Sequence, residues 1–341
     1  MHRSMIGAAA SRGMHAFAAA VFALAAGNAV AAERAAPPAG LGDYPTKNIE
    51  LTIPFAPGGG VDLFGRTVAQ LLNDQKLVTR PITVVNRPGA GGSIGMTLMV
   101  KKKGDAYSLL GIAIHAIVTP LTLGTPHSYR DMTPIAKLFS EYQMLVVRTA
   151  SPIKSLKDVE AALKKDPGSL SIGGASLGNA DHIAIAKFAR AIGIDPGKLN
   201  YIPYSGGESN PAIMGGHVDI GLGGLDLMPH VDAGRMRVLA VSSPKRLGGT
   251  FQKLPTFIEQ GYDVTNENWR GLFGPPEMPP AVVQYWRSAL AQMVQSPAWK
   301  AELEKNQWVP MFETETFRAS LDRDNQTYSV LLKQLGLLKQ P

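Results

Sequence analysis

The chain has 341 residues, contains no cysteine, and carries 34 basic against 27 acidic side chains, a formal net charge of +7. The absence of cysteine excludes disulfides, thiolate metal sites and a lipidated cysteine anchor. The positive charge suits an anionic solute. Residues 101–103 form the only basic cluster, and no aromatic platform accompanies it, so the composition does not support a nucleic-acid partner.

The first 32 residues have the pattern of a cleavable signal peptide. Arg3 and Arg12 supply a positive segment, residues 16–24 are an apolar core, and residues 29–31 (AVA) are a small-residue cleavage signal. The apolar core is too short to span a membrane. We therefore expect an exported, soluble protein, which in a bacterium means the periplasm. About 309 residues remain after cleavage, a length that predicts two lobes, with residues 33–43 as a flexible leader.

The first predicted strand leads into a glycine-rich segment. Ile49–Ile53 has the length and β-branched content of a buried strand, residues 54–62 (PFAPGGGVD) follow it, and residues 63–72 repeat apolar side chains at helical spacing. Such a turn would direct several backbone N–H groups to one point, where a helix dipole favours a small anion. A tight turn capped by Asp62, with no ligand, fits equally well. Because its carboxylate would repel an anion there, we assign Asp62 a capping role.

Two further strand–turn pairs follow. Residues 81–85 predict a strand that ends at a second glycine-rich turn, before a helical stretch over 94–100. The third glycine of GxGxxG would fall on Ile94, and GK[ST] is missing from both turns, so nucleotide binding is not supported. Residues 107–114 predict a third strand, which places His115 at the same end as the glycine turns, where an imidazole could donate to a carboxylate.

The rest of the chain repeats this alternation. Strands are predicted over 144–148 and 170–172, and Ser155 with Asp158 begins the intervening helix with the spacing of a capping box. A third glycine turn, 173–181, precedes a helix over 183–192. Further strands are predicted over 199–203, 218–223 and 237–242, and further helices over 211–214, 280–294, 297–306 and 316–335. The alternation predicts an α/β protein with largely parallel sheets, in which ligands bind at the carboxyl ends of strands.

Residues 174–178 (GASLG) fit the GxSxG pattern of serine hydrolases. A secreted hydrolase with Ser176 as its nucleophile is therefore an alternative function. Candidates for the acid and the histidine of a triad are Asp219, Asp226, His217 and His230. No HGGG-like oxyanion segment occurs, and Asp226 lies very close to His230 in sequence for separate loops. We therefore predict that the protein is not an enzyme and has no catalytic residue.

The remaining candidates for site chemistry are few. The five histidines of the mature chain show no HxH or HxxxH pairing, so we predict no metal site and no cofactor. Trp269 could form a wall of a cleft or belong to the core. Arg270 beside it could hold a carboxylate in bidentate fashion or lie at the surface.

Seven segments of the mature chain carry a family resemblance through their order and spacing: Tyr44-Pro45, PFAPGGGVD (54–62), NRPGAGG (86–92), GGASLGNADH (173–182), YIPYSGGE (201–208), GGHVDIG (215–221) and AGRMRVLAVSSPKR (233–246). Together they resemble the Bug-type receptors of tripartite tricarboxylate transporters, over nearly all of the mature chain. The segments NWRG (268–271) and LPTFIEQGYDV (254–264) look closest to the tricarboxylate-receptor branch.

The resemblance implies a type II periplasmic-binding-protein fold whose two lobes, each a mostly parallel sheet flanked by helices, close on a ligand as a Venus flytrap does. Lobe 1 would be discontinuous, 44–146 plus 242–341, with lobe 2, 147–241, between its parts. The implied partners are a small di- or tricarboxylate, such as a citrate-like acid, and the membrane permease subunits of the transporter. We expect a monomer. An orphan carboxylate receptor that feeds a sensor is a further alternative.

The resemblance also implies where the ligand binds, held mainly by backbone amides and ordered water at one turn of each lobe. The predicted ligand-binding residues are Phe55, Ala56, Pro57, Gly58, Gly59, Gly60, His115, Ala175, Ser176, Leu177, Gly178, Asn179, Ser205, Gly206 and Asp226. Two departures from the family pattern, Ser205 and the small strand end at 221–224, predict an enlarged or altered pocket, so citrate itself is not assigned.

Overall fold

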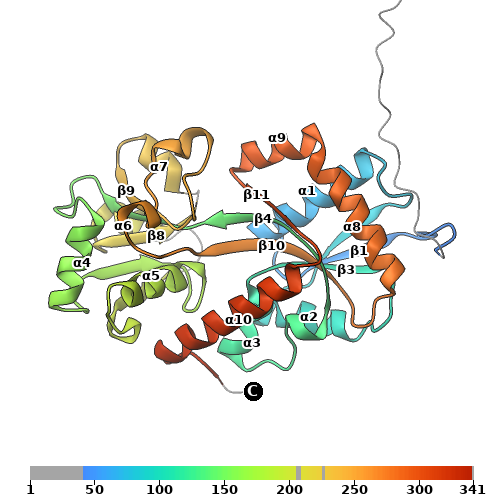
Figure 1. Cartoon of the computed structure of the whole chain (residues 1–341), viewed down its shortest axis with the longest axis horizontal. Coiled ribbons are helices and arrows are strands. Elements are labelled where there is room, and N and C mark those ends of the chain that lie inside the picture. Colours follow the sequence, from blue (N-terminus) through green and yellow to red (C-terminus); the bar gives the residue numbers. More distant parts are fainter. Residues whose placement is uncertain (1–40, 205–208, 225–226, 340–341) are drawn as a thin grey trace, which may run out of the picture. The chain divides into compact units, whose positions relative to one another are not determined.

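Two mixed β-sheets organise the residues that the computed structural model describes, which are 41–204, 209–224 and 227–339. The first sheet consists of β1 (Ile49–Ile53), β2 (Ile82–Asn86), β3 (Ser108–Ala113), β4 (Thr133–Tyr142), β10 (Glu267–Gly274) and β11 (Val309–Glu313), in the order β11-β4-β10-β3-β1-β2. The second consists of β5 (Met144–Arg148), β6 (Ser171–Gly174), β7 (Asn200–Pro203), β8 (Ile220–Gly223) and β9 (Met236–Val241), in the order β7-β6-β8-β5-β9 (Figure 1). The predicted signal peptide, Ser205, Gly206 and Asp226 lie outside the described residues.

Helices follow most of the strands. They are α1 (Gly60–Asp74), α2 (Ser93–Val100), α3 (His115–Leu123), α4 (Leu156–Lys165), α5 (Ala180–Ala191), α6 (Ser209–Gly215), α7 (Met228–Asp232), α8 (Pro280–Gln295), α9 (Pro297–Asn306) and α10 (Phe317–Gln334). α1 buries Phe64, Val68 and Leu72, one turn apart, in the core beneath the first sheet. The predicted capping box of Ser155 and Asp158 at the start of α4 is confirmed. None of the described helices combines the length and the apolar character needed to cross a bilayer.

The predicted α/β fold class, two sheets flanked by helices, is confirmed, but the sheets are less parallel than the sequence predicted. The pairs β1–β2, β1–β3, β6–β7 and β6–β8 are parallel, as expected for strands followed by helices. β10 runs antiparallel to β3 and β4, and β5 runs antiparallel to β8 and β9. The antiparallel pairs arise because β4, β5, β9 and β10 carry the chain from one sheet to the other without a crossover helix.

Hydrogen bonds among buried polar residues join the two passages between the sheets. Only Gln143 separates β4 from β5, and Ser242 follows β9. The N–H of Gln143 donates to Ser242 Oγ, and the N–H of Ser242 donates to the Gln143 carbonyl, each over 2.9 Å. Asn266 Nδ2 donates to Gln143 Oε1 over 2.9 Å, and Ser242 Oγ donates to the Asn266 carbonyl over 2.9 Å. The predicted lobe limits remain a prediction. The chain leaves the first sheet at Gln143 and returns to it at Asn266, because Phe257 and Val264, between β9 and β10, still pack in the core of the second sheet.

Candidate ligand-binding site

The first glycine turn connects β1 to α1 and is exposed from Ala56 to Gly60. Phe55 at its base is half-buried, and its ring lies 4.7 Å from the imidazole of His115, centroid to centroid. A Cβ built on Gly92 would lie 3.3 Å from the same ring, so the turn after β2 reaches Phe55 as well. The carboxyl ends of three parallel neighbours, β1, β2 and β3, therefore meet at this point, as expected for such a sheet.

Asp62 anchors this turn from within the first turn of α1. Its side chain is 4% exposed, and its carboxylate accepts hydrogen bonds from the N–H of Gly58 at 2.9 Å, Arg66 Nε at 2.9 Å and Asn86 Nδ2 at 2.8 Å. Burial alone would raise the pKa of Asp62, but the bonds from Arg66, Gly58 and Asn86 outweigh it and lower that pKa to about 2. The residue in the N-cap position is Gly59, so Asp62 caps the turn from inside the helix.

Asp62 does not use the amides of Gly59 and Gly60 in the first turn. Within the described part of the chain, neither N–H donates a hydrogen bond. Both residues are exposed and stand at the positive end of α1. Their N–H groups can therefore donate hydrogen bonds to an anion or to water.

The second glycine turn, between β6 and α5, is held in the same way. Asp181 accepts from the N–H of Ala175 at 2.9 Å, and His182 Nδ1 accepts from the N–H of Gly178 at 3.1 Å. The imidazole of His182 stacks on Tyr201, with ring centroids 4.1 Å apart, and the Tyr201 hydroxyl donates to the Ala175 carbonyl over 2.6 Å. The sequence assigned Asp181 and His182 no specific role. The signal for Asp181 is an acid in the first turn of the helix, as in the first glycine turn.

The second turn presents its own exposed backbone. Ser176 and Leu177 are exposed, and their N–H groups donate no hydrogen bond to another described residue. The side-chain oxygen of Asn179 accepts from the N–H of Ala180 and so caps α5. Asn179 thus uses its side-chain oxygen for the helix, and the N–H groups of Ser176 and Leu177 remain as main-chain donors of this turn.

Helix α3 contacts both glycine turns. His115 at its start packs on Phe55 of the first turn. Further along the same helix, a Cβ built on Gly178 of the second turn would lie 3.0 Å from Thr122 Cγ2 and 3.7 Å from Val118 Cγ1. His115 and Thr122 are separated by roughly 10 Å of helix. Among the described residues, the first turn, His115 and the second turn therefore all lie against the same helix, α3.

The electrostatic setting of His115 is dominated by burial. Burial, and then the nearby charge of Arg270, lower the pKa of His115 to about 4. The imidazole is therefore neutral at neutral pH, and its Nδ1 is a buried atom without a hydrogen-bond partner among the described residues. A neutral ring can donate to a carboxylate from only one of its nitrogens.

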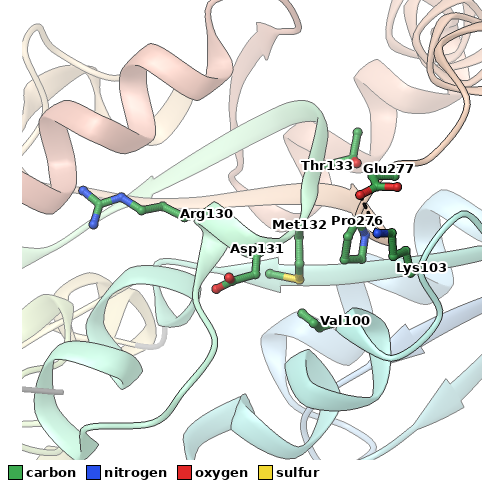
Figure 2. Close-up of a pocket in the computed structure, with 8 residues that line it drawn as sticks. All are labelled: Val100, Lys103, Arg130, Asp131, Met132, Thr133, Pro276 and Glu277. Carbon is green, nitrogen blue, oxygen red and sulfur yellow. Dashed lines mark ion pairs between the residues drawn. The ribbon is translucent and has the colours of Figure 1, made fainter.

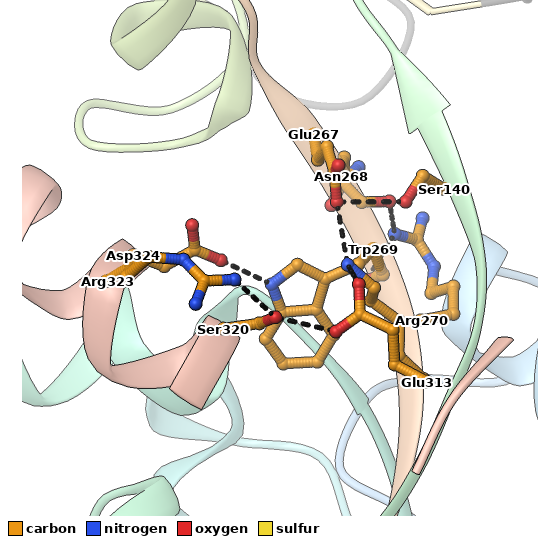
Figure 3. Close-up of polar contacts among 10 residues, drawn as sticks. Ser140, Glu267, Asn268, Trp269, Arg270, Glu313, Ser320, Arg323 and Asp324 are labelled. Carbon is orange, nitrogen blue, oxygen red and sulfur yellow. Dashed lines mark hydrogen bonds and ion pairs between the residues drawn. The ribbon is translucent and has the colours of Figure 1, made fainter. Parts of the chain in front are cut away.

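The sequence left two possibilities each for Trp269 and Arg270, and the structure decides between them. Trp269 is 1% exposed and donates from Nε1 to Asp324 on α10 over 3.2 Å, so it is a core residue (Figure 3). Arg270 is 6% exposed and is not at the surface. Its Nη2 pairs with Glu141 Oε2 at 2.5 Å. This arginine can be buried because it pairs with Glu141, 129 residues earlier in the chain. The local sequence around Arg270 does not predict that pairing.

The described residues do not assemble a serine-hydrolase triad around Ser176. Asp219 accepts from the N–H and hydroxyl of Ser171 at 2.8 and 2.7 Å. Ser171 begins β6, whereas Ser176 follows its end, so Asp219 lies at the wrong end of the strand. His217 and His230 make no hydrogen bond to Ser176, and Asp226 lies outside the described residues.

A separate cavity of about 480 Å³ lies elsewhere on the first sheet (Figure 2). Its lining residues are Val100, Lys103, Arg130, Asp131, Met132, Thr133, Pro276 and Glu277. Thr133 pairs with Gly274 at one end of β4 and β10, and Arg270 pairs with Phe139 towards the other. The cavity contains no predicted ligand residue and is crossed by an exposed ion pair between Lys103 and Glu277 at 2.7 Å, so we place no ligand in it.

Comparison with known proteins identifies the family. Residues 65–337 match the family described as the tripartite tricarboxylate transporter family receptor, TctC. This chain belongs to that family. The TctC family consists of solute-binding receptors rather than enzymes, so at family level the match favours a receptor over the hydrolase alternative.

Individual relatives cover most of this TctC-family chain. Protein BugT of Bordetella pertussis is 29% identical over 275 residues, which are 77% of this chain and 81% of BugT. The crystal structure of a TctC solute-binding protein from Polaromonas is 29% identical, with a TM-score of 0.75, and covers 86% of this chain and 100% of that one. The structure of R. palustris Rpa4515 with adipate, at 22% identity and a TM-score of 0.72, covers 86% and 98% and shares the fold.

The contact between His182 and Gly178 predicts a pH-dependent stability. Burial lowers the pKa of His182 to about 4, whereas the unfolded chain binds this proton near pH 6.5. Because the unfolded state then holds more protons, stability is lost as the pH falls from about 6.5 to about 4. In His182→Asn the amide oxygen can accept from Gly178 without titrating. We expect the native protein to lose on the order of 2 kcal/mol more than His182→Asn over this range, in urea unfolding.

Buried Asp324, whose pKa is raised to about 6, opposes this trend equally in both proteins, and the comparison therefore isolates His182. Parallel stability curves for the native protein and His182→Asn between pH 7 and 4 would contradict the assignment.

Proposed function

We propose that this TctC-family chain is a periplasmic receptor that captures a di- or tricarboxylate between its two glycine turns and delivers it to the membrane permease subunits of a tripartite tricarboxylate transporter. The protein is exported by its signal peptide, residues 1–32, and acts as a monomer. Its lobes are 44–146 plus 242–341 and 147–241. They close about the two passages between the sheets, and the permease recognises the closed form, which the ligand populates by binding it more tightly than the open form.

The observation that carries the proposal is the contact of α3 with both turns. Each turn offers exposed backbone N–H groups, Gly59 and Gly60 on one side and Ser176 and Leu177 on the other. Backbone donors at helix starts suit carboxylates, and a site from which closure removes water strengthens each charged hydrogen bond. The predicted ligand residues, including Ser205, Gly206 and Asp226 outside the described part, complete this proposed site. The adipate bound to the related Rpa4515 fold supports the class of ligand.

A thermal-shift panel tests the proposal. The protein is unfolded and refolded to remove any co-purified ligand, then heated with succinate, malate, adipate, tricarballylate or citrate, and with butyrate and adipamide as controls. At a hundredfold excess over its dissociation constant a ligand adds about 2.7 kcal/mol, which raises the melting temperature of a chain of this size by roughly 4 °C. The proposal requires such a rise with at least one di- or tricarboxylate and a smaller one with both controls. No rise with any acid would contradict it.

A further inference from the structure

The guanidinium of Arg270 lies directly behind the first glycine turn. Its side chain is 7% exposed, and a Cβ built on Gly60 would lie 3.3 Å from its Nη2. Its charge also acts on His115. Arg270 comes from β10, 210 positions after Gly60, and reaches the turn because β10 pairs with β3, with Arg270 opposite Ala113. The turn, the start of α3 and this arginine therefore share one corner of the first sheet.

Arg270 is held in place by hydrogen bonds, but in the described part of the chain not all of its donors are used. Nη2 pairs with Glu141 at 2.5 Å, and Nη1 donates to the Asn268 carbonyl over 3.0 Å. Its Nε is buried without a hydrogen-bond partner among the described residues, as are Asn268 Oδ1 and His115 Nδ1. Buried polar atoms normally have partners. Arg270 and His115 contact the first turn at Gly60 and Phe55, so their unpaired polar atoms indicate a polar environment that an occupant of the turn would complete.

Arg270 can offset the negative charges around the first turn. Asp62 places a buried carboxylate at the start of α1, which opposes an incoming anion, and its own partner is Arg66. Glu141 adds a second carboxylate, in contact with Arg270 Nη2. Arg270 is the buried cation that can offset both, because a guanidinium has five donors and can serve two carboxylates at once.

We propose that Arg270 is a specificity-determining residue that selects an ionised carboxylate at the first turn, while Glu141 positions the guanidinium and limits its strength. One carboxylate of the ligand accepts hydrogen bonds from the amides of Gly59 and Gly60 and from Arg270 Nη2. This inference rests on the proposed function. It adds that the ligand group held by the first turn is charged, so that a neutral amide or ester is rejected there.

Opposite effects of the two members of the ion pair test the inference. Binding of succinate and adipate is measured by calorimetry on refolded native protein, Arg270→Gln, Glu141→Gln and the double variant, with unfolding curves to establish that each is folded. We expect Arg270→Gln to bind roughly tenfold more weakly, because a charge-assisted hydrogen bond is lost. Glu141→Gln should bind these acids at least as tightly as the native protein does, because the ligand no longer competes with Glu141 for the guanidinium.

The double variant is used if Arg270→Gln does not fold. It removes both members of the ion pair and so leaves no unpaired buried charge. It should bind more weakly than Glu141→Gln alone. The matched control is Arg246→Gln with Glu259→Gln, which removes an exposed pair at 2.8 Å. In the described part of the chain this pair makes no hydrogen bond to a predicted ligand residue, so the control should leave binding unchanged.

The outcomes separate the inference from the proposed function. If Arg270→Gln and Glu141→Gln weaken binding alike, or if the double variant equals Glu141→Gln, the ion pair is structural and the inference is overturned while the receptor function stands. If the native protein binds neither these acids nor any other of the panel, the proposed function fails and the inference falls with it.

Discussion

Gly178→Leu is expected to lower carboxylate affinity by roughly a hundredfold, the largest effect on binding among these predictions. Gly178 is buried, has a φ of +76°, and leaves 3.0 Å between its built Cβ and Thr122 Cγ2 and 3.5 Å to Leu332 on α10. A leucine side chain has no room there, so the second turn must move away from α3. The two sets of amides can then no longer reach the same ligand. Calorimetric titration with the acid that gives the largest thermal shift measures the loss.

Backbone strain alone would also lower stability, by about 1–2 kcal/mol for a non-glycine residue at positive φ. Gly193→Leu is the matched control. Gly193 has a φ of +80° and nothing within 4 Å of its built Cβ, so it carries the strain without the contact. Both variants should unfold earlier in urea, and only Gly178→Leu should lose binding. Equal affinities of the two variants would show that the approach of the second turn to α3 is not required.

The strand that carries the first glycine turn and the first strand of the second sheet were predictable because their signal is local. Ile49–Ile53 and Met144–Arg148 were predicted with the bounds that the structure has, since short apolar runs ended by turn residues are typical of buried strands. β4 and β10 lack that signal. Lys137 lies in the middle of β4, 5% exposed, and is paired with Glu267 at 3.1 Å and Glu313 at 2.7 Å. Charges buried by partners far along the chain cannot be read from periodicity.

The candidate site divides in the same way. Phe55–Gly60, His115 and Ala175–Asn179 are marked by glycine turns at strand ends, and the capping role of Asp62 followed from the sign of its charge. Asp181 and His182 bind back only six and four residues, so a closer comparison of the two turns could have found them. Arg270 could not be assigned, because its burial depends on Glu141 and its approach to Gly60 depends on the pairing of β10 with β3. Site residues with a local sequence signal could be predicted, whereas contacts that depend on the order of strands in the sheet could not.

Asp62→Ala should lower the free energy of unfolding by about 3 kcal/mol at pH 7. The substitution removes the acceptor of three hydrogen bonds and leaves the Gly58 amide and Asn86 Nδ2 without it. Losing such a buried, charged acceptor typically costs this amount. Asp62→Asn keeps the shape and should lose about 2 kcal/mol, which corresponds to a pKa lowered from 3.8 to about 2. Urea unfolding measures both.

The pH dependence gives the sharper test of Asp62. Because its folded pKa lies below its unfolded value, the stabilisation is complete above about pH 4 and is lost as the pH falls towards 2. The gap between the native protein and Asp62→Asn should therefore be constant from pH 7 to 5 and narrow below pH 4. Asp158→Asn, at the exposed capping box of α4, is the control and should give a smaller gap at every pH. A gap for Asp62→Asn that stays constant down to the acid limit of folding would mean that the carboxylate charge does not hold the first glycine turn.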